Sequence, residues 1–422
     1  MTISEKLNSN VRTLVKSCRV LERLSRSNPG AKKSEPVYYR MLGDYYERIA
    51  NAVEEGNPTA LHTVFMPAEI LYAMDIVPIH AETSTWMTAA FSGEGSNLLA
   101  KAAEMGLITE ICSAHRGLAG AYALGIMPRP TVMLWSSLMC DNTAKSGDLL
   151  MEINHCPGFF LDHPFNNTPD EVAYLIGEMK KMITFLEDKT GHKMDWDKLS
   201  EIIARSDRQI ELARKVSELR KAVPSPFPPQ RFMELLTPYY LLPGHPEAVE
   251  YMEAIVSDLT EMVVKKQGAT DNERFRLMTL YVPPIYLLGF LGKIAREYGA
   301  VSVCEPFFSF WGEGKLDPSR PLESLAKKSF MFPEMGSYGT FKKQTLDSAV
   351  ANARIYNIDG AIFYAHVGCR QAAGTLKLYK DALNKAGIPL LTLDFDILDP
   401  TVASESEIRQ KLEQFFELLE GG

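Results

Sequence analysis

Short apolar runs alternate with longer amphipathic stretches over two separate parts of the chain. Apolar runs bounded by Gly, Pro or polar positions are typical of buried strands, and the amphipathic stretches between them are typical of helices. This alternation predicts an α/β fold in which a parallel sheet has helices on both faces. The expected strands are residues 61–67, 76–80, 130–135, 158–162, 276–284, 300–306, 359–368 and 389–396.

The pattern divides the chain into four parts. Residues 1–58 are polar and helical, and residues 59–167 form the first α/β domain. Residues 168–272 contain long amphipathic stretches without strands, which predicts a helical insert. Residues 273–422 form the second α/β domain.

The two strand-containing parts resemble each other. VFMPAEILYAMDIVPI and LYVPPIYLLGFLGKIAREYGAVSV share the order strand, proline, apolar helix and strand. This repetition predicts two similar α/β domains. Ligands of such sheets bind beyond the carboxyl ends of the strands, so two domains that face each other would form a cleft.

Composition narrows the class of protein. The chain has 422 residues, a net charge of −8 and a pI of about 5.6, which argues against a nucleic-acid surface. No apolar run is long enough for a transmembrane helix, and the N-terminus lacks the apolar core of a signal peptide. We therefore expect a cytoplasmic protein without a nucleic-acid or membrane partner, in which cysteines stay reduced.

Three of the six cysteines occupy similar positions. Cys112, Cys140 and Cys369 each follow an apolar run and precede a helix-like run, so we expect them at strand ends. A helix N-terminus favours the thiolate form, which iron and zinc require. Three such thiolates in one cleft would form a ligand set for one metal centre, with one coordination position left free.

The alternative is that these cysteines are small buried apolar residues. Cys18 in a helix and Cys304 in a strand fit that interpretation, and Cys156 is ambiguous. The chain has no CxxC pair of the kind that zinc ribbons or ferredoxins use. Spacing alone therefore supports a metal site only weakly.

The chain resembles the 2-hydroxyacyl-CoA dehydratase subunits, a family that includes benzoyl-CoA reductase subunits. The matching segments are FMPAEILYAMDIVP, EICSAHRGLAGAYALG, SSLMCDNTAK, YAHVGCRQAAG and DFDILDP, together with the helical insert. The resemblance implies two Rossmann-like or flavodoxin-like domains with a [4Fe-4S] cluster between them. The implied cluster ligands are Cys112, Cys140 and Cys369.

The same resemblance implies a reaction. A 2-hydroxyacyl-CoA dehydratase removes water from an (R)-2-hydroxyacyl-CoA to give a 2-enoyl-CoA through a ketyl radical. An ATP-dependent iron–sulfur activator supplies the electron, and a homologous second subunit completes a heterodimer. Glu69 and the length of the chain favour the larger, substrate-binding subunit, and Glu69 is the implied catalytic acid or base. Its alternative role is a favourable charge at a helix start.

Two histidines and two arginines flank the expected ligands. His115 and His366 can donate hydrogen bonds to cluster sulfurs or can be ordinary satisfied polar groups, and Arg116 and Arg370 can balance charge or hold a CoA phosphate. Three alternative functions stay open at this point. They are a benzoyl-CoA reductase-type subunit, a non-catalytic electron-relay subunit in which Cys156 is a fourth ligand, and a metal-free α/β binding module.

Overall fold

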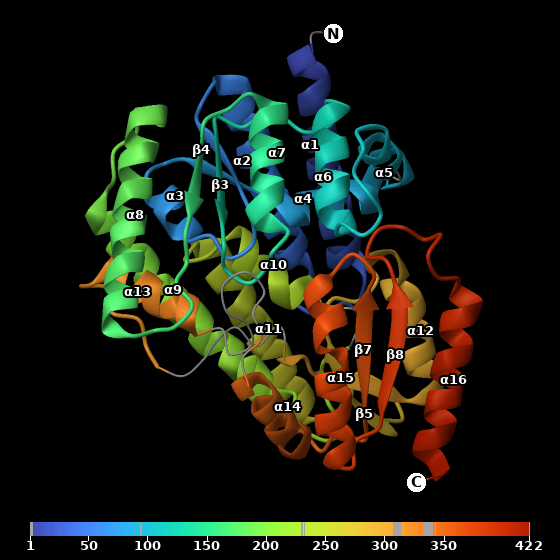
Figure 1. Ribbon diagram of the computed structural model, residues 1–422. Coiled ribbons are helices and arrows are strands. Elements are labelled where there is room, and N and C mark those ends of the chain that lie inside the picture. Colours follow the sequence, from blue (N-terminus) through green and yellow to red (C-terminus); the bar gives the residue numbers. More distant parts are fainter. Residues whose placement is uncertain are drawn as a thin grey trace.

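The computed structural model describes residues 3–92, 95–228, 231, 233–306, 314–331, 341 and 343–421. Its described strands form two four-stranded parallel sheets (Figure 1). The first sheet has the order β2-β1-β3-β4 and the second has the order β6-β5-β7-β8. The strands are β1 Thr59–His62, β2 Val77–His80, β3 Val132–Ser136, β4 Gly158–Leu161, β5 Phe275–Leu280, β6 Ala300–Cys304, β7 Gly360–His366 and β8 Leu390–Phe395. The matching order confirms the predicted pair of similar α/β units.

The first sheet is covered by the two N-terminal helices and by the helices that connect its strands. The N-terminal pair α1 and α2 packs together, and α2 buries a row of tyrosines and aliphatic side chains against β1 and β2. Arg12 and Arg19 of α1 form ion pairs with Glu54 and Asp44 of α2. The helices are α1 Ile3–Ser27, α2 Ser34–Glu55, α3 Ala68–Ala73, α4 Ala81–Ser92, α5 Gly95–Glu104, α6 Ser113–Ala123 and α7 Thr143–Asn154.

The second sheet packs against α12 and α16 through an aromatic contact. Phe416 of α16 stacks on Phe275 at 5.6 Å and on Tyr298 at 4.8 Å. Gly299, predicted to end the preceding helix, adopts φ 68° as its C-cap. The helices of this half are α12 Leu288–Tyr298, α13 Pro321–Phe330, α14 Lys343–Ile355, α15 Arg370–Lys385 and α16 Glu405–Gly421, with a short 3-10 turn, η2, at Ile285–Leu287.

The insert between the sheets is helical in the structure. Its helices are α8 Pro169–Thr190, α9 Trp196–Leu219, α10 Met233–Leu241 and α11 Pro246–Val264. Thr168 and Glu171 form a capping box at the start of α8. Helix α10 was not predicted from the sequence; it contains Pro238 and contacts β2. This helix matters because it brings two tyrosines beside the first sheet.

Two predicted strand ends differ from the structure. β1 ends at His62, and the chain then turns through Phe65, whose φ is 67°, before α3 begins. The apolar run 107–112 forms a turn after Gly106, whose φ is 87°, so Cys112 does not follow a strand. The run is short and, unlike a buried strand, leaves Ile108 exposed to solvent, a difference that the number of apolar residues alone does not reveal.

The strands of the two sheets point toward each other, so their carboxyl ends meet between the domains (Figure 1). Gly368, just after β7, lies against the backbone of Cys112 in the other domain. A Cβ atom at this position would be 2.6 Å from the Cys112 Cα and 2.8 Å from the Ile111 carbonyl oxygen. Glycine therefore lets the two domains touch at the level of the cysteines.

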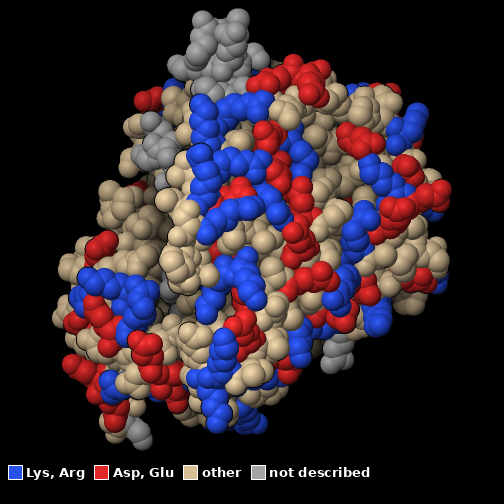
Figure 2. All heavy atoms as spheres, turned by 180° about the vertical axis from the view of Figure 1, so that it is seen from behind, with Lys and Arg blue, Asp and Glu red and all other residues tan. Residues whose placement is uncertain are grey.

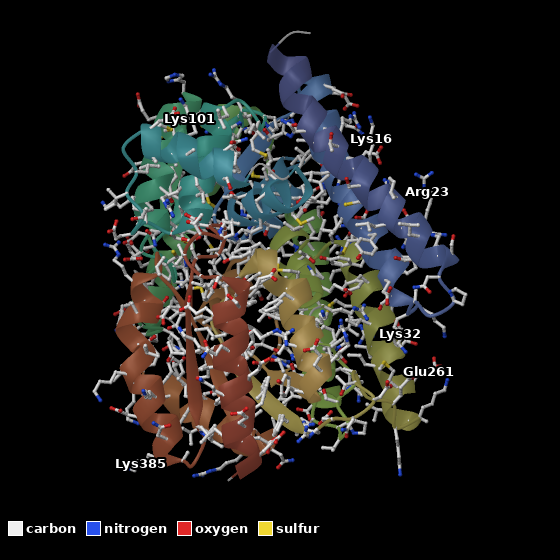
Figure 3. The ribbon with its side chains drawn as sticks, turned by 90° about the vertical axis from the view of Figure 1, so that its right-hand side faces the viewer. Lys16, Arg23, Lys32, Lys101, Glu261 and Lys385 are labelled. Atoms are coloured by element: carbon white, nitrogen blue, oxygen red, sulfur yellow. The ribbon has the colours of Figure 1, made fainter. Side chains whose placement is uncertain are left out.

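The surface carries charges of both signs. On the face opposite that of Figure 1, Lys and Arg side chains are interleaved with Asp and Glu (Figure 2). Lys16 and Arg23 project away from the body of the protein along α1 (Figure 3). No helix among the described residues is long and apolar enough to span a bilayer.

Candidate functional site

Cys112, Cys140 and Cys369 line one cavity of about 120 Å³ between the two domains. Cys112 is the N-cap of α6, Cys140 lies in the loop between β3 and α7, and Cys369 is the N-cap of α15. The structure thus brings together three residues that are far apart in sequence. We call this space the cysteine cavity.

Burial controls the protonation of these thiols. It raises the pKa of Cys112 well above its ordinary value, and the proximity of Cys140 and Cys369 raises it further. Burial likewise raises the pKa of Cys140 to about 12 and raises that of Cys369. Backbone N–H groups at the helix starts lower the pKa of these thiols, as expected, but desolvation by burial outweighs them. A bound metal centre would displace these protons, since thiolates are its ligands.

A chain of polar groups supports Cys112. His366 Nε2 lies 3.3 Å from its Sγ, and Asp396 Oδ2 lies 3.8 Å from His366 Nδ1. Arg116 pairs with Asp396 at 3.4 Å and donates a hydrogen bond from Nε to the Ile111 carbonyl. Burial lowers the pKa of His366 to about 4, so its ring is neutral at pH 7. A neutral imidazole can orient and tune a thiolate without adding charge.

His115 supports Cys140 in a similar way. Its Nε2 lies 3.9 Å from the Cys140 Sγ, and its Nδ1 lies 2.8 Å from the Ser146 Oγ. Burial lowers the pKa of His115 to about 4. Both histidines that the sequence placed near the ligands therefore contact a cysteine.

Three thiols at one cavity are the kind of ligand set that iron–sulfur clusters use. Among the described residues, no three His, Cys, Asp or Glu side chains converge closely enough to hold one metal ion. A cubane binds each cysteine through a different iron, so its ligands lie farther apart and are thiolates. Several buried polar atoms of residues that line the cavity have no hydrogen-bond partner in the described part of the chain: His80 Nε2, Glu82 Oε1, Trp86 Nε1 and Gln371 Nε2. Buried polar groups are normally hydrogen-bonded, so these atoms are available to water or to a group bound in the cavity.

Glu82 is a cavity residue that was not singled out from the sequence. It lies in the first turn of α4, directly after β2, and accepts a hydrogen bond of 3.0 Å from the Val64 N–H. Burial raises its pKa to about 7. A carboxyl with such a pKa can hold or release a proton near neutral pH. The sequence could have pointed to Glu82, because it follows the predicted strand 76–80 more closely than Glu69 follows β1.

We expect Glu82 to make stability fall as the pH rises. Between pH 4.5 and about 7 the unfolded chain ionises this carboxyl before the folded protein does, so the folded state loses free energy of unfolding across that window. The difference between a pKa of about 7 and the ordinary 4.5 corresponds to roughly 3 kcal/mol. In metal-free protein, urea unfolding at several pH values should show this loss for the wild type and not for Glu82→Gln. Parallel pH profiles would contradict the assignment.

Glu69 lies outside the cysteine cavity. It is buried in the first turn of α3 and lines a neighbouring cavity of about 50 Å³, which we call the Glu69 cavity. Lys328 and Ser206 both bind its Oε1, at 2.5 and 2.9 Å. The described residues offer no hydrogen bond to Oε2. Phe65, His80 and Tyr240 line both cavities and form the wall between them.

The other residues that the sequence singled out lie elsewhere. Cys156 precedes β4 and does not line the cysteine cavity, and Cys18 and Cys304 are buried in the core. Arg370 forms an exposed ion pair of 2.7 Å with Asp141 across the two domains.

Comparison with known proteins gives consistent matches. The family model described as "2-hydroxyglutaryl-CoA dehydratase, D-component" matches residues 63–419. A benzoyl-CoA reductase subunit of Thauera aromatica is 23% identical over 94% of this chain and 97% of its own. The (R)-2-hydroxyisocaproyl-CoA dehydratase alpha subunit of Clostridioides difficile is 24% identical over 92% and 97%. The (R)-phenyllactyl-CoA dehydratase alpha subunit of Clostridium sporogenes is 21% identical over 94% and 98%.

Proposed function

Because the chain belongs to the 2-hydroxyglutaryl-CoA dehydratase D-component family, we propose that it is the iron–sulfur subunit of a 2-hydroxyacyl-CoA dehydratase. The reaction would be elimination of water from an (R)-2-hydroxyacyl-CoA to a 2-enoyl-CoA. The observation that carries the proposal is the cysteine cavity, where three thiols from two domains meet. The names of the dehydratase relatives support the reaction class.

Cys112, Cys140 and Cys369 would hold a [4Fe-4S] cluster. When bound, the cluster would supply one low-potential electron to the thioester carbonyl, which would allow the 2-hydroxyl group to leave, and it would take the electron back as the 2-enoyl-CoA forms. Among the described residues no fourth cysteine lines the cavity, which favours a cluster with one open position over a closed relay cluster. The buried walls keep water away from the radical.

Glu69 is the proposed base for the β-proton of the substrate. The β-carbon is two bonds from the thioester carbonyl. If the carbonyl lies at the cysteines, the β-carbon can lie toward the neighbouring cavity, where Glu69 is. Ser206 and Lys328 bind one carboxylate oxygen of Glu69, and the described residues offer no hydrogen bond to the other. Glu82, closer to the cysteines, is suited to protonate the leaving hydroxyl group.

Replacing Glu69 with glutamine should lower kcat by about 100- to 10,000-fold, the range for a lost general base. The amide keeps a hydrogen-bond acceptor for Ser206 but cannot take a proton. Exchange of the substrate β-hydrogen with deuterated solvent should be lost in parallel, while iron content stays at the wild-type value. Unchanged exchange in Glu69→Gln would show that the base is another residue.

The proposed assembly includes a homologous second subunit, because the dehydratase relatives are named alpha subunits. An ATP-dependent iron–sulfur activator would supply the electron. The match to the benzoyl-CoA reductase relative supports ring reduction as a second candidate function. Anaerobic incubation of the complete complex with an (R)-2-hydroxyacyl-CoA and with benzoyl-CoA separates the two. A 2-enoyl product supports dehydration, and a reduced ring contradicts it.

A further inference from the structure

The Glu69 cavity has apolar walls and one internal ion pair. Its described apolar lining comes from several elements: Phe65, Met66, Leu138, Leu161, Met179 and Leu325. α13, which contributes Leu325, packs against α8 and α9 beside the first sheet (Figure 1). The cavity lining is therefore largely apolar.

The cationic group in this lining is already neutralised. Lys328 binds Glu69 at 2.5 Å and lies over the Tyr239 ring. His163 lies within hydrogen-bond distance of the Pro164 carbonyl and of Ser329 through its two ring nitrogens. Burial lowers the pKa of His62 to about 4 and lowers that of His80, so both rings are neutral. A carboxylate that entered this cavity would meet the negative charge of Glu69 and no unpaired cation in the described lining.

The wall toward the cysteine cavity is made of rings. Phe65 packs edge-on against Tyr240 at 5.7 Å, and His80 lies 5.2 Å from Tyr240. Phe65 holds a left-handed backbone conformation with φ 67°, which is costly for a non-glycine residue and is typical of functional sites. The two cavities are therefore neighbours, separated by the side chains of Phe65, His80 and Tyr240.

We propose that the Glu69 cavity binds the acyl chain of the CoA thioester and selects an uncharged chain over one that ends in a carboxylate. This inference rests on the proposed function, because the thioester carbonyl must sit at the cysteines for its chain to reach Glu69. The physical basis is the cost of burying a carboxylate without a counter-charge. The Clostridioides difficile relative is named for an uncharged chain, hydroxyisocaproyl, and a further relative, from Acidaminococcus fermentans, is named for hydroxyglutaryl, which ends in a carboxylate. Membership of the family therefore does not by itself decide between the two kinds of chain.

The test compares two thioesters with five-carbon chains that lack the 2-hydroxyl group and cannot react. Pentanoyl-CoA and glutaryl-CoA differ by the terminal carboxylate, and calorimetry with the anaerobic protein gives both Kd values. We expect glutaryl-CoA to bind at least about tenfold more weakly at pH 7. Equal or tighter binding of glutaryl-CoA overturns the proposal, and so does the absence of binding by either thioester.

Two variants of Leu161 test whether the acyl chain binds in the Glu69 cavity. Leu161→Phe narrows the cavity and should weaken pentanoyl-CoA binding several-fold, whereas acetyl-CoA, whose chain does not reach the cavity, should keep its wild-type Kd. If Leu161→Phe does not fold, Leu161→Ala widens the same wall and should shift preference toward longer uncharged chains. Unchanged chain-length preference in a folded variant overturns the proposal.

The iron content of the same samples separates this inference from the proposed function. Discrimination between pentanoyl-CoA and glutaryl-CoA in protein that holds no iron would support the cavity assignment and contradict the dehydratase. Iron-loaded protein that prefers glutaryl-CoA would leave the dehydratase standing and overturn the cavity assignment.

Discussion

Serine at any one of the three cavity cysteines should remove the cluster and nearly all activity. An alcohol is a poor ligand for iron compared with a thiolate, and the two remaining cysteines cannot hold a cubane. Loss of a supporting residue alone typically costs about 10- to 100-fold in metal affinity or activity, so loss of a ligand should cost at least about 100-fold. The measurement is iron and acid-labile sulfide per chain in Cys112→Ser, Cys140→Ser and Cys369→Ser, purified without oxygen.

The matched controls are two buried cysteines outside the cavity. Cys156→Ser and Cys304→Ser change the same atoms in the same kind of surroundings, and both should keep the wild-type iron content. Iron loss in the Cys156 variant would make Cys156 a ligand and would reopen the electron-relay function. Full iron content in the three cavity variants would exclude these cysteines as the ligand set.

Alanine at Gly368 should also disrupt the site, although Gly368 is not a ligand. The added methyl group would lie 2.6 Å from the Cys112 Cα and 2.8 Å from its amide nitrogen, and backbone cannot move aside as a flexible side chain can. The strain should cost about 1–3 kcal/mol of stability and should separate Cys112 from Cys369. We expect a lower melting temperature and a large loss of iron per chain.

Gly374→Ala is the control for this prediction. Gly374 lies six residues later, in α15, where an added methyl group meets no atom within 4 Å. In a helix interior this replacement should keep or slightly raise stability, by up to about 1 kcal/mol. Equal iron content in both alanine variants would show that close approach at Gly368 does not hold the cysteines together.

Much of the architecture was predictable because it follows from local pattern. Apolar runs predicted parallel sheets, and the repeated strand–proline–helix pattern predicted two similar α/β domains; the strand order was not predicted. The three cysteines were expected together in one cleft because each would follow a strand. They do line one cavity, but not all of them follow a strand. Cys369 follows a strand closely, whereas Cys112 follows a turn and reaches the cavity through the start of α6.

The missed features depend on contacts between distant parts of the chain. The pairing of Glu69 with Lys328 joins residues 259 positions apart, and α10 is held in place by its neighbours despite Pro238. The raised pKa values of the thiols and of Glu82 arise mainly from burial in the folded protein. Local sequence carries no signal for such desolvation, because it depends on what covers the residue in the folded protein.

The most direct test is the iron and sulfide content of the wild-type protein, purified without oxygen. We expect about four irons and four sulfides per chain, with a spectrum that changes when an acyl-CoA thioester is added. Colourless protein without iron, in a sample that folds and binds its partner subunit, would contradict the cluster and the mechanism built on it.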